Sequence, residues 1–349
     1  MSEWRAEPVA RLCLSFILHP SAFILTLQMP PRRRPGKKLL KAFLPIVLVL
    51  LLAVALVAGW IVHRATRPPR AAYLVTPETF SQLSARGLKA TNETWANTDG
   101  TEARGWLLRG SEGAPAVLLL HSYGSDRSHL FNLAVKLNET TNYTVLLPDM
   151  RGHGEDPPVQ WTSLGGREAE DARAALGFLR ALKTTQGNAQ VGDALGIHGV
   201  ELGAYAALRA AVPNRNVRAL VLDSVPASPD EMLAVAMKRN LGLENSLLRM
   251  IARAGIRIYF MGGYDNVATC AEAAALTDRQ VLLLSGADAG PLHDSSNALA
   301  QCFPKGAQVE VKTDLTLSGI NQRAATGEQS ETYDRRVIDF FDRTLRATR

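Results

Sequence analysis

A pentapeptide with glycine at both ends, Gly199-Val200-Glu201-Leu202-Gly203, most constrains how this 349-residue chain can fold. The apolar run before it, residues 194–198, is typical of a strand, and residues 204–209 after it are typical of a helix. Glycines two positions either side of a central residue permit a sharp strand-to-helix turn, because a side chain there would collide with the turn. The sequence therefore predicts that Glu201 stands at the apex of such a turn.

Three other stretches combine with this turn in a resemblance to the α/β-hydrolase family that spans residues 92–345. Residues 116–124 are similar to the family's third strand and following His-Gly turn, residues 143–154 to its fourth strand with the Asp-x-Arg-Gly-His-Gly turn, and residues 280–288 to the strand that delivers the catalytic acid. Apolar strands also alternate with amphipathic segments such as 167–182 and 330–345, which predicts a mostly parallel sheet covered by helices on both faces. We expect an α/β-hydrolase fold over residues 76–349, with a small helical lid at about 227–268.

The resemblance also assigns catalytic positions, and this sequence fills most of them with unsuitable residues. Glu201 occupies the nucleophile position, and Asp288 the acid position, although it follows Gly286 by two residues where the family usually has three. The base position aligns with Ile320, which cannot take a proton. The oxyanion hole would consist of the backbone amides of Tyr123 and Leu202.

Without a base, neither of two known reaction cycles closes. A serine enzyme needs a histidine to activate its hydroxyl, and relatives with Asp at the nucleophile position need one to activate the water that cleaves the enzyme ester. His293, just beyond Asp288, is the candidate replacement base, whereas we expect structural roles for His121, His153 and His198.

Two interpretations of Glu201 remain open. As a carboxylate at a helix start it would be stabilised by the exposed amides and the helix dipole, by roughly 0.3–1 kcal/mol. Alternatively, it binds a cation or a hydrogen-bond donor in the pocket, or acts as a general base.

The N-terminal part of the chain predicts a membrane anchor. Residues 42–62 form an uncharged run of 21 residues, long enough to cross a bilayer core of ~30 Å as a helix. Six basic residues lie before this run, between positions 32 and 41, and three lie after it, between 64 and 70. The more basic N-terminal flank is expected to stay in the cytoplasm, which places the domain outside. We expect a basic leader at 1–41, a single uncleaved transmembrane helix at 42–62 and a linker at 63–75. Residues 1–28 are interpreted as an artefact preceding a true start at Met29, with a second, poorer membrane segment as the alternative.

Charge and cysteine content limit the partners and cofactors. Residues 1–70 hold 11 of the 39 Lys/Arg and 2 of the 33 Asp/Glu, which leaves 28 and 31 in residues 71–349, so the domain is slightly acidic and we expect no nucleic-acid partner. We also expect no metal site and no cofactor, because no zinc spacing, P-loop or dinucleotide fingerprint appears. Cys270 and Cys302 would be free to pair in an oxidising compartment, and two buried free thiols are the alternative.

Three functions from different classes follow. The first is a membrane-anchored α/β-hydrolase-fold pseudoenzyme that acts as a binding or scaffolding module for an unknown small molecule or protein. The second is an active hydrolase of ester-like small molecules that uses Glu201 or a non-standard nucleophile. The third is a purely structural protein of a bacterial envelope.

Overall fold

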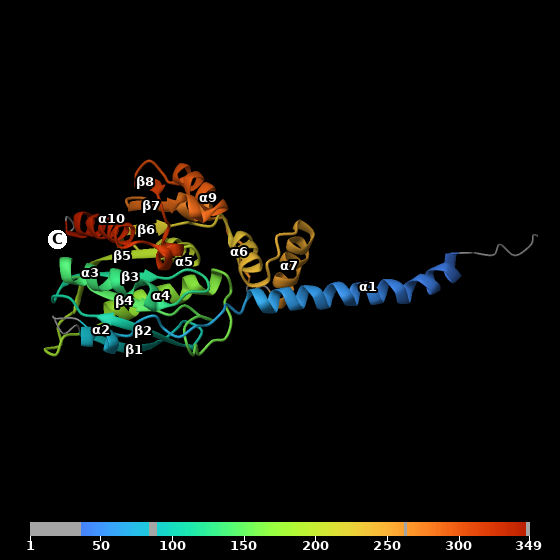
Figure 1. The fold of residues 1–349 in the computed structure, drawn as a ribbon, viewed down its shortest axis with the longest axis horizontal. Coiled ribbons are helices and arrows are strands. Elements are labelled where there is room, and N and C mark those ends of the chain that lie inside the picture. Colours follow the sequence, from blue (N-terminus) through green and yellow to red (C-terminus); the bar gives the residue numbers. More distant parts are fainter. Residues whose placement is uncertain (1–35, 84–88, 262–263, 347–349) are drawn as a thin grey trace, which may run out of the picture. The chain divides into compact units, whose positions relative to one another are not determined.

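A computed structural model describes residues 36–83, 89–261 and 264–346 (Figure 1). The described part contains a single eight-stranded sheet in the order β1-β2-β4-β3-β5-β6-β7-β8. Its strands are β1 (Ala90–Ala96), β2 (Glu102–Leu108), β3 (Ala114–Leu120), β4 (Thr144–Pro148), β5 (Val191–Val200), β6 (Val217–Asp223), β7 (Gln280–Gly286) and β8 (Gln308–Leu315). β2 pairs antiparallel with both β1 and β4, and all other pairs are parallel. The predicted mostly parallel α/β-hydrolase sheet is confirmed.

Helices cover both faces of the sheet because its central strands are apolar on both sides. β3 and β4 are buried at every position, which is typical of parallel strands between two helical layers. One core contains side chains from α3 (Phe131–Thr141) and α10 (Gly327–Arg346), and the other contains those of α4 (Gly166–Ala181) and α5 (Leu202–Ala211).

The segment between β6 and β7 carries three helices. α6 (Pro229–Leu241) and α7 (Ser246–Tyr259) lie in the region where the sequence predicts a lid, and α8 (Thr269–Ala274) follows them. α6 ends at Gly242, whose φ of 65° is in the left-handed region that glycine tolerates. After β7 come the short helix η2 (Ala287–Ala289), α9 (Pro291–Leu299) and η3 (Ala300–Cys302).

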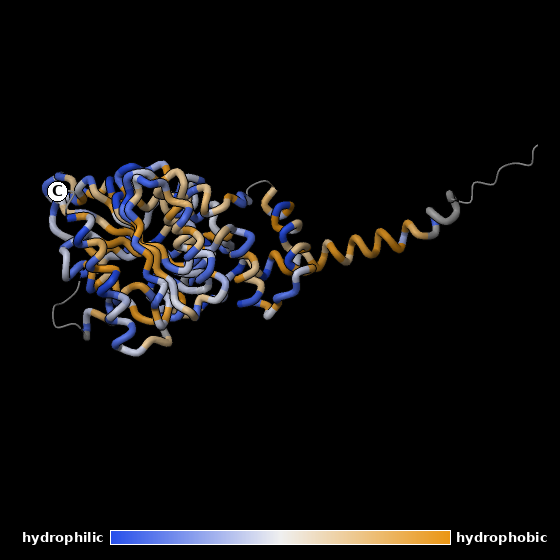
Figure 2. The backbone as a smooth tube through the Cα atoms, turned by 90° about the horizontal axis from the view of Figure 1, so that it is seen from above, coloured by the Kyte–Doolittle hydropathy of each residue, from blue (hydrophilic) through white to orange (hydrophobic). Residues whose placement is uncertain are grey.

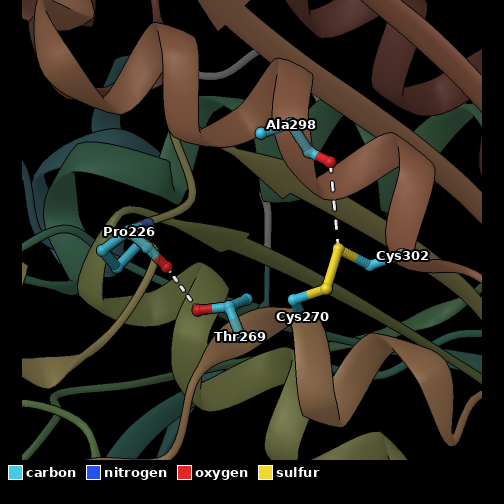
Figure 3. The surroundings of a disulfide bond; sticks show 5 residues. All are labelled: Pro226, Thr269, Cys270, Ala298 and Cys302. Atoms are coloured by element: carbon cyan, nitrogen blue, oxygen red, sulfur yellow. Dashed lines mark hydrogen bonds between the residues drawn. A yellow bond between two sulfur atoms is a disulfide. The ribbon is translucent and has the colours of Figure 1, made fainter.

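A disulfide joins Cys270 on α8 to Cys302 on η3, with the two Cα atoms 5.2 Å apart (Figure 3). Beside it, the Thr269 hydroxyl donates a hydrogen bond to the Pro226 carbonyl, which fixes the start of α8 to the loop after β6. The predicted pairing is therefore the one that the structure forms.

The N-terminal helix α1 (Gly36–Ala65) is apolar along most of its length (Figure 2). The span Phe43–Ala65 contains an 18-residue stretch with a mean hydropathy of 2.9 and is long and apolar enough to cross a membrane. Residues up to Leu50 form one compact unit, and a second begins at Leu51. Within the second unit Ala58, Ile61, Val62 and Ala65 are buried. A short helix, α2 (Pro77–Leu83), precedes the first strand.

Candidate functional site

The strand-to-helix turn predicted around Glu201 connects β5 to α5. Glu201 has φ 53° and ψ −107°, a conformation that costs a non-glycine residue about 1–3 kcal/mol. A Cβ atom at Gly199 would collide with the Gly203 carbonyl, and one at Gly203 with the Leu120 carbonyl of β3. Both glycines are therefore required by close backbone contacts, as the sequence predicts.

The Glu201 side chain folds back onto the predicted oxyanion hole. It is fully buried, and its Oε2 accepts a hydrogen bond of 2.9 Å from the backbone N–H of Tyr123. Tyr123 follows β3 and is one of the two predicted oxyanion donors. Leu202, the other, is the buried first residue of α5. A carboxylate oxygen thus stands at an amide that would receive a substrate oxygen in a working hydrolase.

Arg239 of α6 supplies the counter-charge. Its Nη2 lies 2.6 Å from Glu201 Oε1 and its Nη1 3.2 Å from Oε2, so the guanidinium holds the carboxylate with both nitrogens. Nη1 also donates to the Tyr123 carbonyl at 2.6 Å. Arg239 is not predictable from the sequence, because nothing local distinguishes it from the other basic residues of the lid. A carboxylate buried at position 201 needs such a donor.

Tyr123 connects this site to the end of α1. Its hydroxyl donates to the Ala65 carbonyl at 2.7 Å and accepts from Asn240 Nδ2 at 2.6 Å. Asn240 Nδ2 also lies 3.0 Å from the Arg64 carbonyl. Burial raises the pKa of the Tyr123 hydroxyl, which stays protonated and can donate. The hydrogen bonds therefore run from the elbow through Tyr123 to the last turn of α1.

Asp288, the predicted acid, lies in η2 after β7. Its carboxylate is hydrogen-bonded by the loop that follows β8. Its carboxylate accepts from Ser318 N at 2.8 Å, from Ser318 Oγ at 2.9 Å and from Asn321 Nδ2 at 2.7 Å. Ile320, at the predicted base position, packs partly buried against a hydrophobic core. Asn321, one residue after the predicted base position, therefore contacts the predicted acid.

A buried network around Asp223 joins the elbow to this loop. Asp223, at the end of β6, accepts from Gly319 N at 2.6 Å and from the Tyr333 hydroxyl at 2.8 Å, and its carbonyl accepts from Glu201 N at 2.8 Å. His198 Nε2 lies 3.0 Å from the same Tyr333 hydroxyl. Burial raises the pKa of Asp223. These contacts give Asp223 a positioning role between the elbow and the loop after β8.

The histidines of the turns and of β5 are buried and neutral. Burial lowers the pKa of His121 to about 4 and the pKa of His153 and of His198 to about 3. His121 Nδ1 donates to the Ser122 carbonyl and its Nε2 accepts from Met150 N at 3.0 Å, so both ring nitrogens hold the turns together. These contacts agree with the expected structural roles.

His293, the candidate replacement base, lies in the first turn of α9. Its Nδ1 is buried without a hydrogen-bond partner. Among the interactions of the described residues, none joins His293 to Glu201 or to Asp288. Within residues 36–83, 89–261 and 264–346 there is also no group of three or more His, Cys, Asp or Glu side chains arranged to hold a metal ion.

A cavity of about 280 Å³ lies beside the site, not around Glu201. It is lined by residues of β1, β2, α4 and the loop after β4, among them Trp95, Asp149, His153 and Asp171. Tyr73 donates to Asp149 at 2.6 Å, and Arg151 forms ion pairs with Asp99 and Asp171 there. Many side chains that line the cavity therefore form ion pairs that fix the turn after β4.

Comparisons with known proteins agree with the fold. A family model described as the alpha/beta hydrolase family matches residues 117–336, more than half of the chain. An esterase of Pyrococcus furiosus is similar in structure with a TM-score of 0.56 and 20% identity, over 80% of this chain and 98% of the esterase. An acylaminoacyl peptidase of Pyrococcus horikoshii has a TM-score of 0.55 and 15% identity, over 76% of this chain and 43% of the peptidase. A dienelactone hydrolase of Anabaena variabilis has a TM-score of 0.50 and 14% identity, over 74% of this chain and 99% of that protein. No curated protein matches the chain in sequence.

Proposed function

The chain belongs to the α/β-hydrolase family, and from that premise we propose that it is a membrane-anchored member that does not hydrolyse esters and acts as a binding or scaffolding module. The observation that carries the proposal is the Glu201 carboxylate at the Tyr123 amide, held there by Arg239.

This contact opposes acyl-transfer chemistry. The oxyanion hole stabilises a tetrahedral intermediate through donors aimed at the developing negative charge. Here the Tyr123 amide already donates to a carboxylate, and a substrate carbonyl would have to displace both that carboxylate and its ion pair. The same ion pair lowers the nucleophilicity of Glu201, because Arg239 donates to both carboxylate oxygens.

The acid and base positions support the same conclusion. Asp288 accepts three hydrogen bonds from Ser318 and Asn321, and Ile320 has no group that could carry a proton. A serine introduced at position 201 would therefore lack a base to activate it.

The anchor is the second part of the proposal. α1 has the length and hydropathy of a spanning helix, and the excess of basic residues before it favours a cytoplasmic N-terminus with the domain extracytoplasmic. A hydrolase fold held at a membrane without turnover is suited to binding a small molecule or a protein partner.

Turnover of p-nitrophenyl esters by the full chain and three variants tests the catalytic part. We expect background rates for the wild type, Glu201→Ala and Glu201→Ser, and measurable turnover only when Glu201→Ser is combined with Asn321→His, because position 321 is the one that contacts Asp288. A fluorophosphonate probe should label the double variant and not the wild type. Wild-type turnover well above background that Glu201→Ala abolishes would establish the alternative, an active hydrolase in which Glu201 is catalytic.

A further inference from the structure

The lid helix α7 exposes a continuous apolar stripe to solvent. Leu247, Met250, Ala254 and Ile258 are exposed and follow one another at intervals of three or four residues, so they share one face of the helix. Met261, immediately beyond the helix, is 92% exposed, and Ile258 is 76% exposed. A stripe of this length on one helix is unusual for a surface that faces water.

A second face of α7 is already occupied. Ala252 and Ile256 are fully buried in the core of the second compact unit. This other face therefore makes the contact with the core that an amphipathic helix normally makes. Packing against the core does not account for the exposed apolar stripe.

Gly255 lies between these two faces and contacts α1. A Cβ atom placed on Gly255 would lie 3.1 Å from Ala58 Cβ and 3.2 Å from Val62 Cγ2. The backbone of α7 thus packs closely on the last two turns of α1 (Figure 1). Helices in such contact have axes about 8–10 Å apart. α7 therefore lies within one helix diameter of the segment that we expect to leave the bilayer.

The faces of α1 turned away from this contact also carry apolar side chains. Val57 is 41% and Trp60 54% exposed, and tryptophan is favoured where a spanning helix meets the lipid headgroups. Both α1 and α7 thus expose apolar side chains outside their mutual contact.

Arginines follow a third side of α7, at positions 249, 253 and 257. Arg253 and Arg257 lie 3.5 and 3.7 Å from Asp230, yet both side chains remain largely exposed. An apolar stripe bordered by arginines is the arrangement by which a helix lies in a membrane interface and contacts lipid phosphates.

We propose that α7 lies in the interface of the membrane that α1 spans, with Leu247, Met250 and Ile258 at the boundary of the acyl chains and the arginines toward anionic headgroups. This inference rests on the anchoring proposed above and extends it. The lid is then a fixed contact between the domain and the bilayer.

Site-specific fluorescence in lipid vesicles tests the inference. The full chain carrying Cys13→Ser and one introduced cysteine is labelled with an NBD fluorophore and reconstituted in phosphatidylcholine and phosphatidylglycerol. The reporters are Ile258→Cys and Met250→Cys, and the matched control is Lys312→Cys, on an exposed position of the edge strand β8. All three positions are exposed, so labelling should leave the fold intact.

We expect both α7 reporters to shift to shorter emission wavelength and to lose most of their emission when the vesicles contain lipids brominated on the acyl chains, while position 312 changes little. Emission at 258 and 250 equal to that at 312 would place α7 in water and overturn the inference. A blue shift without quenching would overturn it in favour of a second copy of the chain covering the stripe.

Alkaline extraction of the same vesicles tests the anchor by itself. A chain that resists extraction but is not quenched at α7 refutes the interfacial helix and leaves the anchor standing. A chain that is extracted refutes the anchor and, with it, the inference.

Discussion

Two features of Glu201 are energetically unfavourable, and a surface residue would have neither. Its backbone adopts a strained positive φ, and its carboxylate is fully buried. A buried charge is tolerated only when it is paired and hydrogen-bonded. Arg239 and the Tyr123 amide meet this requirement, so the stability of the elbow depends on a residue of the lid.

Arg239→Ala should destabilise the full chain in detergent by about 2–4 kcal/mol, because it leaves the Glu201 carboxylate buried without a counter-charge. The double variant Arg239→Ala with Glu201→Gln should recover most of that loss. The matched control is Arg253→Ala, whose side chain is largely exposed, lies 3.5 Å from Asp230 and contributes less than about 1 kcal/mol through that ion pair. Chemical denaturation measures all three, and an Arg239→Ala effect no larger than that of Arg253→Ala would contradict the role of the pair.

His198 makes the free energy of unfolding depend on pH. Its pKa in the folded protein is lowered by burial to about 3, against about 6.5 when unfolded. As the pH falls, His198 therefore binds a proton in the unfolded chain before it does so in the folded protein. The contribution of neutral His198 to the free energy of unfolding is present above pH 6.5 and is lost between about pH 6.5 and 3. Replacement by glutamine, which can still donate to the Tyr333 hydroxyl, should make the acid-side slope shallower by up to about 1.4 kcal/mol per pH unit. Denaturation curves at several pH values check this, and identical slopes for the two proteins would refute it.

At the scale of the elements, glycines mark where helix and sheet backbones approach most closely. Gly203 opens the first turn of α5 against the carbonyls of Leu120 and His121, which have no freedom to move because they continue β3. Gly177, in contrast, lies on an exposed face of α4, and a Cβ atom added there would have no other atom within 4 Å.

These two glycines should respond to alanine in opposite directions. Gly203→Ala should lower the free energy of unfolding by about 3 kcal/mol or more through the backbone clash. Gly177→Ala should raise it by about 0.5–1 kcal/mol, because alanine is the better helix former. Thermal melts of the two variants provide the comparison. Equal changes would mean that the elbow can relax around an added methyl group.

At the scale of the whole molecule, the disulfide and the anchor both concern the side of the membrane on which the domain lies. The Cys270–Cys302 bond closes a segment with a sequence separation of 32 and ties α8, which follows the lid, to η3, which precedes the edge strand β8. Such a bond persists where the surroundings are oxidising, which is the side on which we expect the domain to lie.

We therefore expect mass spectrometry of unreduced peptides from freshly isolated membranes to find Cys270 linked to Cys302. The double variant Cys270→Ser with Cys302→Ser should lose roughly 3–4 kcal/mol of stability, the value for a loop of this length. Protease added to sealed right-side-out vesicles should digest the domain. Complete protection together with two alkylatable thiols would place the domain in the cytoplasm.

Much of this architecture is determined by local sequence. The glycines around Glu201, the turn of residues 149–154 and the apolar strands predict the hydrolase fold, and the hydropathy of residues 42–62 predicts the long apolar helix that the structure contains. Periodicity and turn chemistry depend on neighbours in the chain, and for that reason they can be recognised without coordinates.

Tertiary structure alone decided which groups meet. Arg239 reaches Glu201 from 38 positions away, and Asn321 meets Asp288 from 33. The contact of Gly255 with Ala58 likewise joins segments that no local pattern connects. Many arginines, asparagines and glycines in the chain could have filled these positions equally well by composition. Only the packing of the lid and the loops onto the sheet selects the partners, because an ion pair or a close helix contact depends on distance in space.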